Sequence, residues 1–598
     1  MKKWSLFAAA ASLAAIPAMA QDAQDYRARP ASDEVVYFVL PDRFDNGDPT
    51  NDRGGIKGDR LAHGYDPTHK GFYHGGDLAG LTGKLDYLEA MGITAIWFAP
   101  IFKNKPVQGP AGDESAGYHG YWVTDFTSVD PHFGTNDEFK AFVDAAHARG
   151  MKVYMDIITN HTADVIRYKD GDYSYRSKAD YPYSTRGGVN GEPINEGFAG
   201  DEVQTLENFA RLTDPNYAYE VHVPEAEKYV KKPAWLNDPI YYHNRGDTRF
   251  FGEDSLYGDF VGLDDLFTEH PLVVGGMIEI YGDWIERFGI DGFRIDTARH
   301  VNPEFWQQFI PAMKARADAA GIPHFHMFGE IFRDDSNNGY IAQYTRRDRL
   351  PSVLDFAFQM AVRETVVEGK GTHVLANLFA GDVLYEGGEE TALSLPTFLG
   401  NHDMGRFAHF VRAKRPDEDP SEALARVTLA HAMLMTLRGS PVIYSGSEQG
   451  FVGDGGDQLA REDMFPSKVD VYNDNMLLGT DATTAEANFD QSHPLYQEIA
   501  MLAAMRADNA ALRRGRQVTR AYEEEPGLFA ASRFDPDSGK ETLLLFNTSD
   551  QPISGQVLVS TASTEFTTLA GQCSPEVSAP GSLSYALAPF AYAVCAAR

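Results

Sequence analysis

The sequence predicts an α/β protein, a (β/α)8 barrel (TIM barrel) that carries a domain inserted after its third strand and is followed by an antiparallel β-sandwich. Apolar runs of strand length alternate with segments of helical periodicity along most of the 598 residues. A segment rich in Tyr, Gly, Asp and Asn, residues 162–265, interrupts this alternation after the third run. Beyond residue 516 the pattern changes to short runs typical of antiparallel strands. A chain of this length exceeds one ordinary core, so several domains are expected.

Eight apolar runs are expected to form the strands of the barrel. They occupy residues 35–40, 93–99, 152–158, 292–296, 324–329, 353–358, 396–400 and 441–445. Helices are expected between them, among others at residues 137–149, 273–287, 303–319 and 421–437. Strands that alternate with helices form a parallel sheet with right-handed crossovers. Eight such units close into a barrel whose active site lies at the carboxyl ends of the strands.

These patterns divide the chain into parts. The barrel is expected to comprise residues 34–161 and 266–516, separated by the inserted domain at 162–265. A last helix is expected at residues 493–513, and the β-sandwich is expected at 517–598.

The N-terminus has the features of a secretory signal. Two lysines precede an apolar stretch at residues 6–16, and an Ala-x-Ala cleavage site ends at Ala20. Residues 1–20 are therefore expected to be a signal peptide and 21–33 a linker. No cysteine follows the cleavage site, so no lipid anchor is expected, and no later stretch is long enough to span a membrane. The protein is expected to be exported, to the periplasm or the external medium.

Charge and cysteine content limit the function classes. The net charge of −33, without a basic stripe, argues against a nucleic-acid partner and favours solubility. The only cysteines are Cys573 and Cys595. An oxidising compartment favours a disulfide between them over two separate buried thiols.

Polar residues gather where the predicted strands end. Arg294 and Asp296 lie two positions apart at the end of the fourth run, so both side chains point to the same face. The arginine is expected to keep the carboxylate ionised, as a nucleophile requires. Three other runs are followed by polar groups as well: Asn160 and His161, Glu330, and Asn401, His402 and Asp403. One face of the barrel is therefore expected to collect them.

The four segments at these ends resemble the signature regions of the α-amylase family of glycoside hydrolases. In family order they read DIITNH, GFRIDTARH, FGEIF and FLGNHD, and the segment YHGYWVTD at residues 118–125 resembles a further family segment. The resemblance runs from about residue 34 to beyond residue 450. It implies a barrel whose inserted segment is the family's B domain, one wall of the cleft. It also implies hydrolysis of α-1,4 bonds in starch-like glucans with retention of configuration.

The resemblance assigns the catalytic roles. It implies that Asp296 is the nucleophile, Glu330 the general acid and base, and Asp403 the third carboxylate, which stabilises the oxocarbenium-like state. Retaining enzymes hold their two carboxyl groups roughly 5–5.5 Å apart. Clustered negative charge is expected to raise the proton affinity of Glu330, as an acid requires.

The resemblance also implies the substrate contacts. Neutral histidines can donate to sugar hydroxyls without bringing a charge into the cleft, and Tyr121 is expected to stack beneath the sugar at the cleavage point. Asp156 is expected to support the arginine. The implied substrate-binding residues are Tyr121, His161, Arg294, Arg299, His300 and His402.

Two calcium sites are implied. The run at residues 46–52 packs oxygen donors around turn formers and, with a later Gly-Gly-Asp, resembles a calcium loop of cyclodextrin-forming amylases; the alternative is an ordinary Asx-rich turn. Its implied ligands are Asn46, Asp48, Asn51, Asp52, Gly75 and Asp77. The second set is Asn160, Asp265 and the carbonyl of His300, next to Asp264, where α-amylases commonly have proline.

Alternatives on the same scaffold stay open. A cyclodextrin-forming or transglycosylating enzyme usually carries further C-terminal domains, which this chain is too short to hold. A cyclomaltodextrinase or maltogenic hydrolase is a second alternative. The signature segment that ends at Arg299 and His300, however, resembles α-amylases and cyclodextrin glucanotransferases more than neopullulanases. A silent glucan-binding protein is disfavoured because all three carboxylates are present. A starch or maltooligosaccharide substrate and a monomer are expected.

Overall fold

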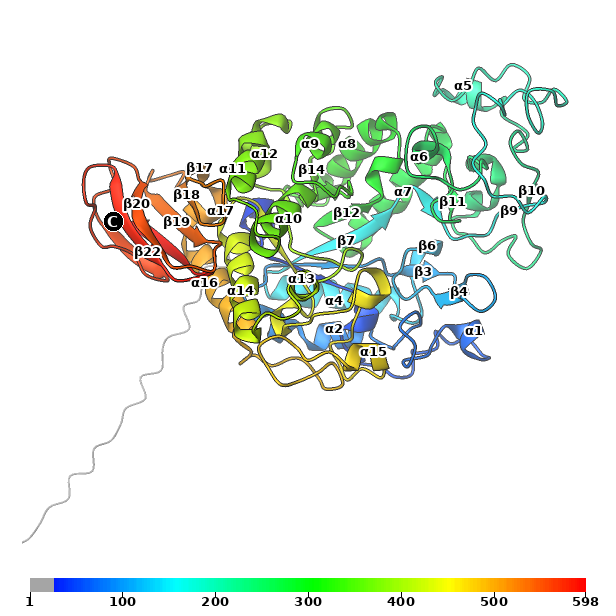
Figure 1. Ribbon diagram of the computed structural model, residues 1–598. Helices are drawn as coiled ribbons and strands as arrows, with labels where there is room; N and C mark the ends of the chain where they lie inside the picture. The colour runs from blue at the N-terminus through cyan, green and yellow to red at the C-terminus, as the bar shows by residue number, and fades with distance from the viewer. Residues whose placement is uncertain (1–25) are drawn as a thin grey trace, which may run out of the picture.

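An eight-stranded parallel barrel forms the centre of the protein (Figure 1). The computed structural model describes residues 26–598, so the expected signal peptide and the first residues of the linker lie outside the described part. The strands are β1 (Val36–Val39), β2 (Ala95–Phe98), β7 (Lys152–Ile158), β12 (Gly292–Asp296), β13 (His326–Gly329), β14 (Ser352–Val353), β15 (Pro396–Thr397) and β16 (Ser440–Tyr444). Their order is β14-β13-β12-β7-β2-β1-β16-β15. The gap between the outermost strands is bridged by Asp355, whose N–H donates to the carbonyl of Pro396 at 2.9 Å. The predicted barrel is confirmed.

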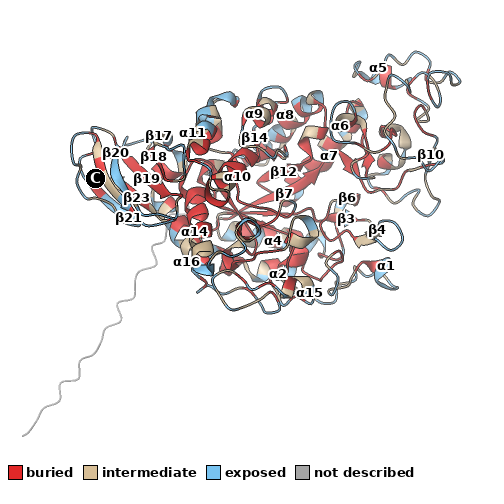
Figure 2. Ribbon diagram, viewed as in Figure 1, coloured by how far each residue is buried: buried red, intermediate tan, exposed pale blue. Residues whose placement is uncertain are grey.

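Helices cover the outer face of the strands and side chains fill the interior of the barrel, so every residue of β7 and β12 is buried (Figure 2). The 13-residue helix α4 begins with a capping box between Thr135 and Glu138. Helix α7 begins at Pro271 and ends at Phe288, after which Gly289 caps it with a left-handed backbone that favours glycine. The principal helices are α2 (Leu78–Gly83), α3 (Leu85–Ala90), α4 (Asn136–Ala148), α7 (Pro271–Phe288), α8 (Pro303–Ala319), α9 (Gly339–Arg346), α10 (Phe356–Val362), α11 (His373–Ala380), α12 (Glu389–Ala392), α13 (Phe407–Lys414), α14 (Pro420–Thr436) and α16 (Pro494–Asp508).

Two predicted elements are wrong in part. The sixth run was expected as a strand over 353–358, but β14 ends at Val353 and α10 starts at Phe356. The carboxylate of Asp355 accepts the N–H of Phe358 at 3.0 Å and caps that helix. The last helix, expected over 493–513, breaks at Asn509, which caps a separate short helix, α17 (Ala510–Arg514).

A long excursion follows β7 and returns before α7. Its two ends pair as β8 (His161–Thr162) and β11 (Asp264–Asp265), antiparallel. Between them the chain is mostly irregular, with the short elements β9 (Arg167–Tyr168), α5 (Leu206–Phe209), β10 (Val221–His222), η4 (Ala234–Asn237), η5 (Pro239–Tyr241) and α6 (Asp254–Tyr257). In Figure 1 the part with β9, β10 and α5 extends from the side of the barrel opposite to the C-terminal strands. A smaller excursion after β2 forms β3 (Phe102–Asn104), β4 (Val107–Gln108), β5 (Ser115–Ala116) and β6 (Val123–Val129).

The C-terminal part is a β-sandwich, as predicted. One sheet has the order β17-β18-β19-β23-β21 and the other pairs β20 with β22. The strands are β17 (Arg516–Ala521), β18 (Leu528–Phe534), β19 (Glu541–Asn547), β20 (Ile553–Leu558), β21 (Phe566–Ala570), β22 (Ser582–Leu587) and β23 (Tyr592–Ala597). Leu543 and Leu545 of the first sheet pack with Val557 and Leu583 of the second in one buried cluster.

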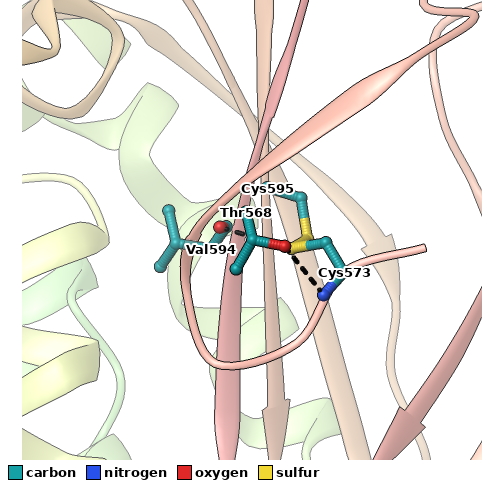
Figure 3. Close-up of a disulfide and its surroundings, with 4 residues drawn as sticks. All are labelled: Thr568, Cys573, Val594 and Cys595. Carbon is teal, nitrogen blue, oxygen red and sulfur yellow. Dashed lines mark hydrogen bonds between the residues drawn. A yellow bond between two sulfur atoms is a disulfide. The ribbon is translucent and has the colours of Figure 1, made fainter. Parts of the chain in front are cut away.

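The two cysteines form the expected disulfide, Cys573–Cys595, at the edge of this sandwich (Figure 3). Cys595 lies on β23, and the backbone N–H of Cys573 donates to Thr568 Oγ1 on β21 at 3.2 Å. The bridge therefore ties the loop after β21 to the final strand.

Residues 26–33, expected as part of a linker, pack against the barrel. Arg29 binds Glu34 and the carbonyls of Thr94 and Gly150, at 3.0, 3.2 and 2.8 Å respectively. Asp33 binds Arg514 of α17. No helix within residues 26–598 is long and apolar enough to cross a membrane.

Candidate active site

A cleft of about 710 Å³ opens at the carboxyl ends of the barrel strands. The three predicted carboxylates, Asp296, Glu330 and Asp403, all line it. Its lining also includes Tyr121, His161, Phe250, Phe260, Arg299, His300, Phe332 and Arg461. Strand ends of β12 and β13, the loop after β15 and the inserted excursion thus contribute to a single site.

Arg294 lies at the centre of the carboxylates. Its Nη1 atom lies 2.8 Å from Asp296 Oδ1 and 2.8 Å from Asp156 Oδ1, while Nη2 lies 3.0 Å from Glu330 Oε1. Parallel pairing of β12 with β7 places Arg294 directly beside Asp156. One guanidinium therefore holds carboxylates from three adjacent strand ends together.

Glu330 is also held by the backbone that follows Asp296. Thr297 adopts a left-handed backbone with φ of 48°, which is uncommon for a β-branched residue. Its N–H donates to Glu330 Oε2 at 3.1 Å. The tight turn after β12 therefore aims a donor at the neighbouring carboxylate.

Burial raises the pKa of two aspartates in this cluster. For Asp296, burial raises the pKa well above its usual range, the charge of Arg294 opposes the rise, and the charge of Glu330 adds to it. For Asp156, burial raises the pKa to about 7 against the same opposing arginine. Arg294 favours the ionised form of Asp296, as expected, but the loss of hydration on burial outweighs this one ion pair and the net shift is upward. The arginine limits the rise and does not reverse it.

Tyr121 and His402 form a second layer. The Tyr121 hydroxyl lies 3.0 Å from His402 Nε2 and donates to Asp156 Oδ2 at 3.2 Å. Their rings are nearly parallel, with centroids 5.7 Å apart. Burial lowers the pKa of His402 to about 3, so this imidazole is neutral at pH 7. His402 is 1% exposed and lies behind Tyr121 and Asp403, which line the cleft.

Asp403 is held by a residue that the sequence did not indicate. Arg461 Nη2 donates to Asp403 Oδ1 at 3.0 Å, and Arg461 Nε donates to the carbonyl of His402 at 3.0 Å. Burial raises the pKa of Asp403, but the nearby His402 and Arg461 outweigh it, so that the net shift is downward. Arg461 stands in a run of three charged residues, Arg461-Glu462-Asp463, that are all buried. Such a run is usually solvated, so the sequence carried no signal for this contact.

The remaining predicted substrate contacts lie around the rim. His161 and His300 line the cleft, and burial lowers their pKa values to about 3 and about 4. Arg299 donates to the carbonyl of Phe250 at 2.7 Å and to that of Phe332 at 3.2 Å. Those two phenylalanines are 41% and 45% exposed, so Arg299 connects two loops that carry aromatic rings into the cleft.

The two halves of the first predicted calcium loop lie close together. A Cβ on Gly75 would lie 2.5 Å from Asn46 Nδ2 and 2.6 Å from Asp52 Oδ1, so the two halves of the loop meet. Asp77 accepts the N–H of Asp48 at 2.8 Å and Nδ2 of Asn51 at 3.1 Å. Two amide oxygens of the loop, Oδ1 of Asn46 and of Asn51, are buried without a hydrogen-bond partner. Oxygen donors without partners are what a hard cation requires, so these residues fit calcium.

The second predicted set fits a cation poorly. The carboxylate of Asp265 lies 2.6 Å from His243 Nδ1, and the same ring reaches Glu269 at 2.9 Å. The side chain of Asn160 is 3.3 Å from His161. Within residues 26–598 no group of three histidine, cysteine or carboxylate side chains is placed to hold a metal. The first loop differs because two of its amide oxygens, those of Asn46 and Asn51, are buried without a partner.

Comparison with known proteins agrees with this geometry. The chain is 49% identical to an α-amylase of Streptomyces lividans over 82% of its own length and 53% of that protein's, so it spans about half the length of such curated relatives. An α-amylase structure from Anoxybacillus aligns over 95% of this chain and 99% of the other, with a TM-score of 0.67 and 26% identity.

A cyclomaltodextrin glucanotransferase with a three-domain ABC distribution aligns over 94% of this chain and 99% of its own, with a TM-score of 0.66 and 26% identity. Although such enzymes usually carry further C-terminal domains, this one has three domains, so the length of the chain does not by itself distinguish the two activities. The family described as alpha amylase, catalytic domain, matches residues 38–515. With that match over most of its length, the chain belongs to the α-amylase family.

Proposed function

We propose that the protein hydrolyses internal α-1,4-glucosidic bonds of starch and related maltooligosaccharides with retention of configuration. The observation that carries the proposal is the position of Asp296 and Glu330, which bind the two terminal nitrogens of one guanidinium, Arg294, at 2.8 and 3.0 Å within one cleft. Two carboxyl groups this close suit a nucleophile and an acid with no room for water between them, the arrangement of retaining enzymes.

The residues divide the chemistry as follows. Asp296 attacks the anomeric carbon while Glu330 gives its proton to the departing glycosidic oxygen, which leaves a glycosyl ester on Asp296. Glu330 then removes a proton from water, whose oxygen attacks the same carbon and releases Asp296. Asp403, held by Arg461, binds sugar hydroxyls and favours the positive charge that develops on the ring.

The neutral groups around the carboxylates position the sugar. Tyr121 offers a ring face, and His161 and His300 line the cleft as neutral rings that can donate to hydroxyls. His402 acts through Tyr121 and Asp403, since it is buried behind them. Arg299 contacts two carbonyls, so we assign it to positioning Phe250 and Phe332 instead of direct sugar binding.

A second candidate function is transglycosylation, including cyclodextrin formation. It is favoured by the coverage of the three-domain glucanotransferase and by the exposed aromatic rings of Phe250 and Phe332 in the cleft, which suit a bound acceptor sugar. A cyclomaltodextrinase or maltogenic hydrolase uses the same catalytic groups. The products distinguish these activities.

The test is a product-time course on soluble starch with the wild type and with Glu330→Gln. Early mixed maltooligosaccharides that are absent with the variant support the endo-acting hydrolase. Cyclic or lengthened products would assign the transferase, and early release of a single short product would assign the maltogenic type. Starch left intact by folded wild type would reject the proposal.

The remaining features follow from the same assignment. We infer that residues 1–20 are a signal peptide and that the protein is exported, in keeping with its disulfide. We also infer that residues 162–265 act as the B domain, residues 34–161 and 266–516 as the barrel, and 517–598 as the C-terminal domain. Asn46, Asp48, Asn51, Asp52, the carbonyl of Gly75 and Asp77 would hold calcium, which would stabilise the loop. A monomer is proposed.

A further inference from the structure

A second cavity lies at the other end of the barrel, between barrel helices and the first strands of the C-terminal sandwich. Its volume is about 780 Å³, against about 710 Å³ for the cleft. It is lined by residues of α11, α12, β17 and β18, which lie close together in Figure 1, and by Arg438. Because Arg438 precedes β16, the cavity lies near the amino ends of the strands, whereas Asp296 lies at a carboxyl end.

Three aromatic rings line this second cavity. Tyr522, in the turn after β17, is 54% exposed, and Phe379 of α11 and Phe534 of β18 are half-buried. Arg438 covers the Phe379 ring at 5.1 Å. Partly open aromatic faces lined by polar groups are suited to the apolar C–H faces of a sugar ring.

Donors without acceptors surround these rings. Gln517 lines the cavity; its Oε1 accepts the backbone N–H of Arg438 at 2.9 Å, but its Nε2 is buried without a partner. The exposed Arg516 also lines it, and its side chain makes no hydrogen bond or ion pair within residues 26–598. A buried donor left unpaired, such as Nε2 of Gln517, costs about 1–3 kcal/mol, so it favours a ligand that carries acceptor oxygens.

Arg533 is a further donor that lacks a full set of acceptors. It lies directly opposite Gln517 in the pairing of β17 with β18. The side chain is fully buried, donates only to the carbonyls of Gly515 and Thr436, and has an unpartnered Nη2 atom. The region beneath the cavity is thus rich in donors.

The charges of the lining are nearly balanced, which decides against an ionic ligand. Four carboxylates and three guanidinium groups face the cavity: Asp382, Glu389, Glu390 and Asp535, and Arg438, Arg514 and Arg516. Two of the arginines are already paired, Arg438 with Asp382 and Arg514 with Asp33. Phosphate would meet exposed carboxylates, and a cation would meet unpaired donors. A neutral ligand with many hydroxyl groups satisfies donors and acceptors alike.

We propose that this cavity binds a second segment of α-glucan, separate from the one in the cleft. The proposal rests on the proposed function, since it assigns the substrate class of the cleft to a second site. A chain held there attaches the enzyme to the polymer while the cleft acts elsewhere on it, so the site raises local substrate concentration without touching the reacting bond.

The test is titration calorimetry of the full chain carrying Glu330→Gln with maltoheptaose. Two classes of binding are expected. Adding Tyr522→Ala, or Gln517→Ala, should weaken one class by about tenfold or more, because a stacking face or an unpaired donor is lost. Adding Tyr121→Ala should remove the other class. Leu558→Ala, which removes an exposed apolar side chain from β20 of the same sandwich, should leave both classes intact.

A single class of binding would overturn the proposal, as would two classes that both survive Tyr522→Ala and Gln517→Ala. Inorganic phosphate that raises the unfolding temperature of wild type but not of Gln517→Ala, with no second maltoheptaose class, would assign the cavity to an anion instead. Failure of the proposed function would appear separately, as wild type that leaves starch intact.

Discussion

The guanidinium of Arg461 lies 3.0 Å from the carboxylate of Asp403 and fixes the backbone beside it through the His402 carbonyl. Replacing Arg461 by methionine should lower kcat/KM on maltooligosaccharides by about 10- to 100-fold, since a hydrogen bond to a charged group contributes roughly 1.5–3 kcal/mol. Arg461→Lys keeps the positive charge but not the forked set of donors of a guanidinium, and should lose less activity than Arg461→Met. Steady-state kinetics of both variants, with melting curves to check folding, test this. Equal activity of wild type and Arg461→Met would contradict the role.

Glu330 and Asp296 are each expected to be indispensable. Glu330→Gln should reduce turnover by at least about 10²–10⁴-fold while maltoheptaose still binds, because general acid–base catalysis is lost and the cleft is not. Asp296→Asn should be at least as damaging, since no covalent intermediate can form. Turnover and calorimetric binding are measured on the same preparations. An active Asp296→Asn protein would place the nucleophile elsewhere.

The pH profile should show an acid limb above the ordinary aspartate pKa of about 3.9. Burial raises the pKa of Asp296, and the nucleophile must be ionised, so activity is lost as pH falls through that raised value. Arg294→Lys, which keeps a charge but cannot bind all three carboxylates, should move the limb to higher pH. The profile of kcat/KM between about pH 3 and 8 provides the measurement. A limb at or below pH 3.9 in wild type would refute the inference.

Removal of calcium should lower the unfolding temperature through the loop at Asn46 and Asn51. Binding to the native state at 100 times the dissociation constant contributes about 2.7 kcal/mol. EGTA should therefore shift the melting curve of wild type, and the shift should shrink in Asn51→Ala, which deletes an unpartnered amide oxygen. Asn160→Ala, at the set that fits poorly, should keep the full shift. No response of wild type to EGTA would exclude the site.

Reduction of Cys573–Cys595 should destabilise the C-terminal sandwich. The bridge joins positions 22 residues apart, and closing a loop of this size contributes roughly 3 kcal/mol in the chain-entropy account. Melting curves of Cys573→Ser/Cys595→Ser against wild type, with dithiothreitol as a second comparison, measure the effect. An unchanged melting curve in both would show that the bridge contributes little.

Much of the barrel could be predicted because its strands are buried runs bounded by turn residues. The error at residues 353–358 has a local cause. Alternating apolar residues there are typical of a strand, but Asp355 caps a helix that begins at Phe356. A helix-capping residue inside an apolar run favours a helix, whereas the alternation of apolar residues favours a strand. Only the packing of the closed barrel decides between the two.

The candidate site was predictable where motif residues end strands and obscure where contacts span the sequence. Asp296 is the last residue of β12, and Glu330 directly follows β13. Arg461 reaches Asp403 from 58 residues away, and Arg299 reaches back 49 residues to Phe250. Contacts between residues so far apart depend on the paths of the loops, and the loop sequences have no periodic pattern from which those paths could be predicted. The sequence also could not show that burial raises the pKa of Asp296, since burial is a property of the folded site.

The pairing of β8 with β11 holds the two ends of the inserted segment together where they join the barrel. Because His161 and Thr162 lie beside Asp265 and Asp264, the excursion leaves and re-enters the barrel at almost the same place. The entropic cost of closing a loop grows only with the logarithm of its length, so segments of very different size can be inserted between two such paired ends. The barrel can thus be kept while this wall of the cleft is exchanged, and the range of glucans accepted can change without refolding the catalytic centre.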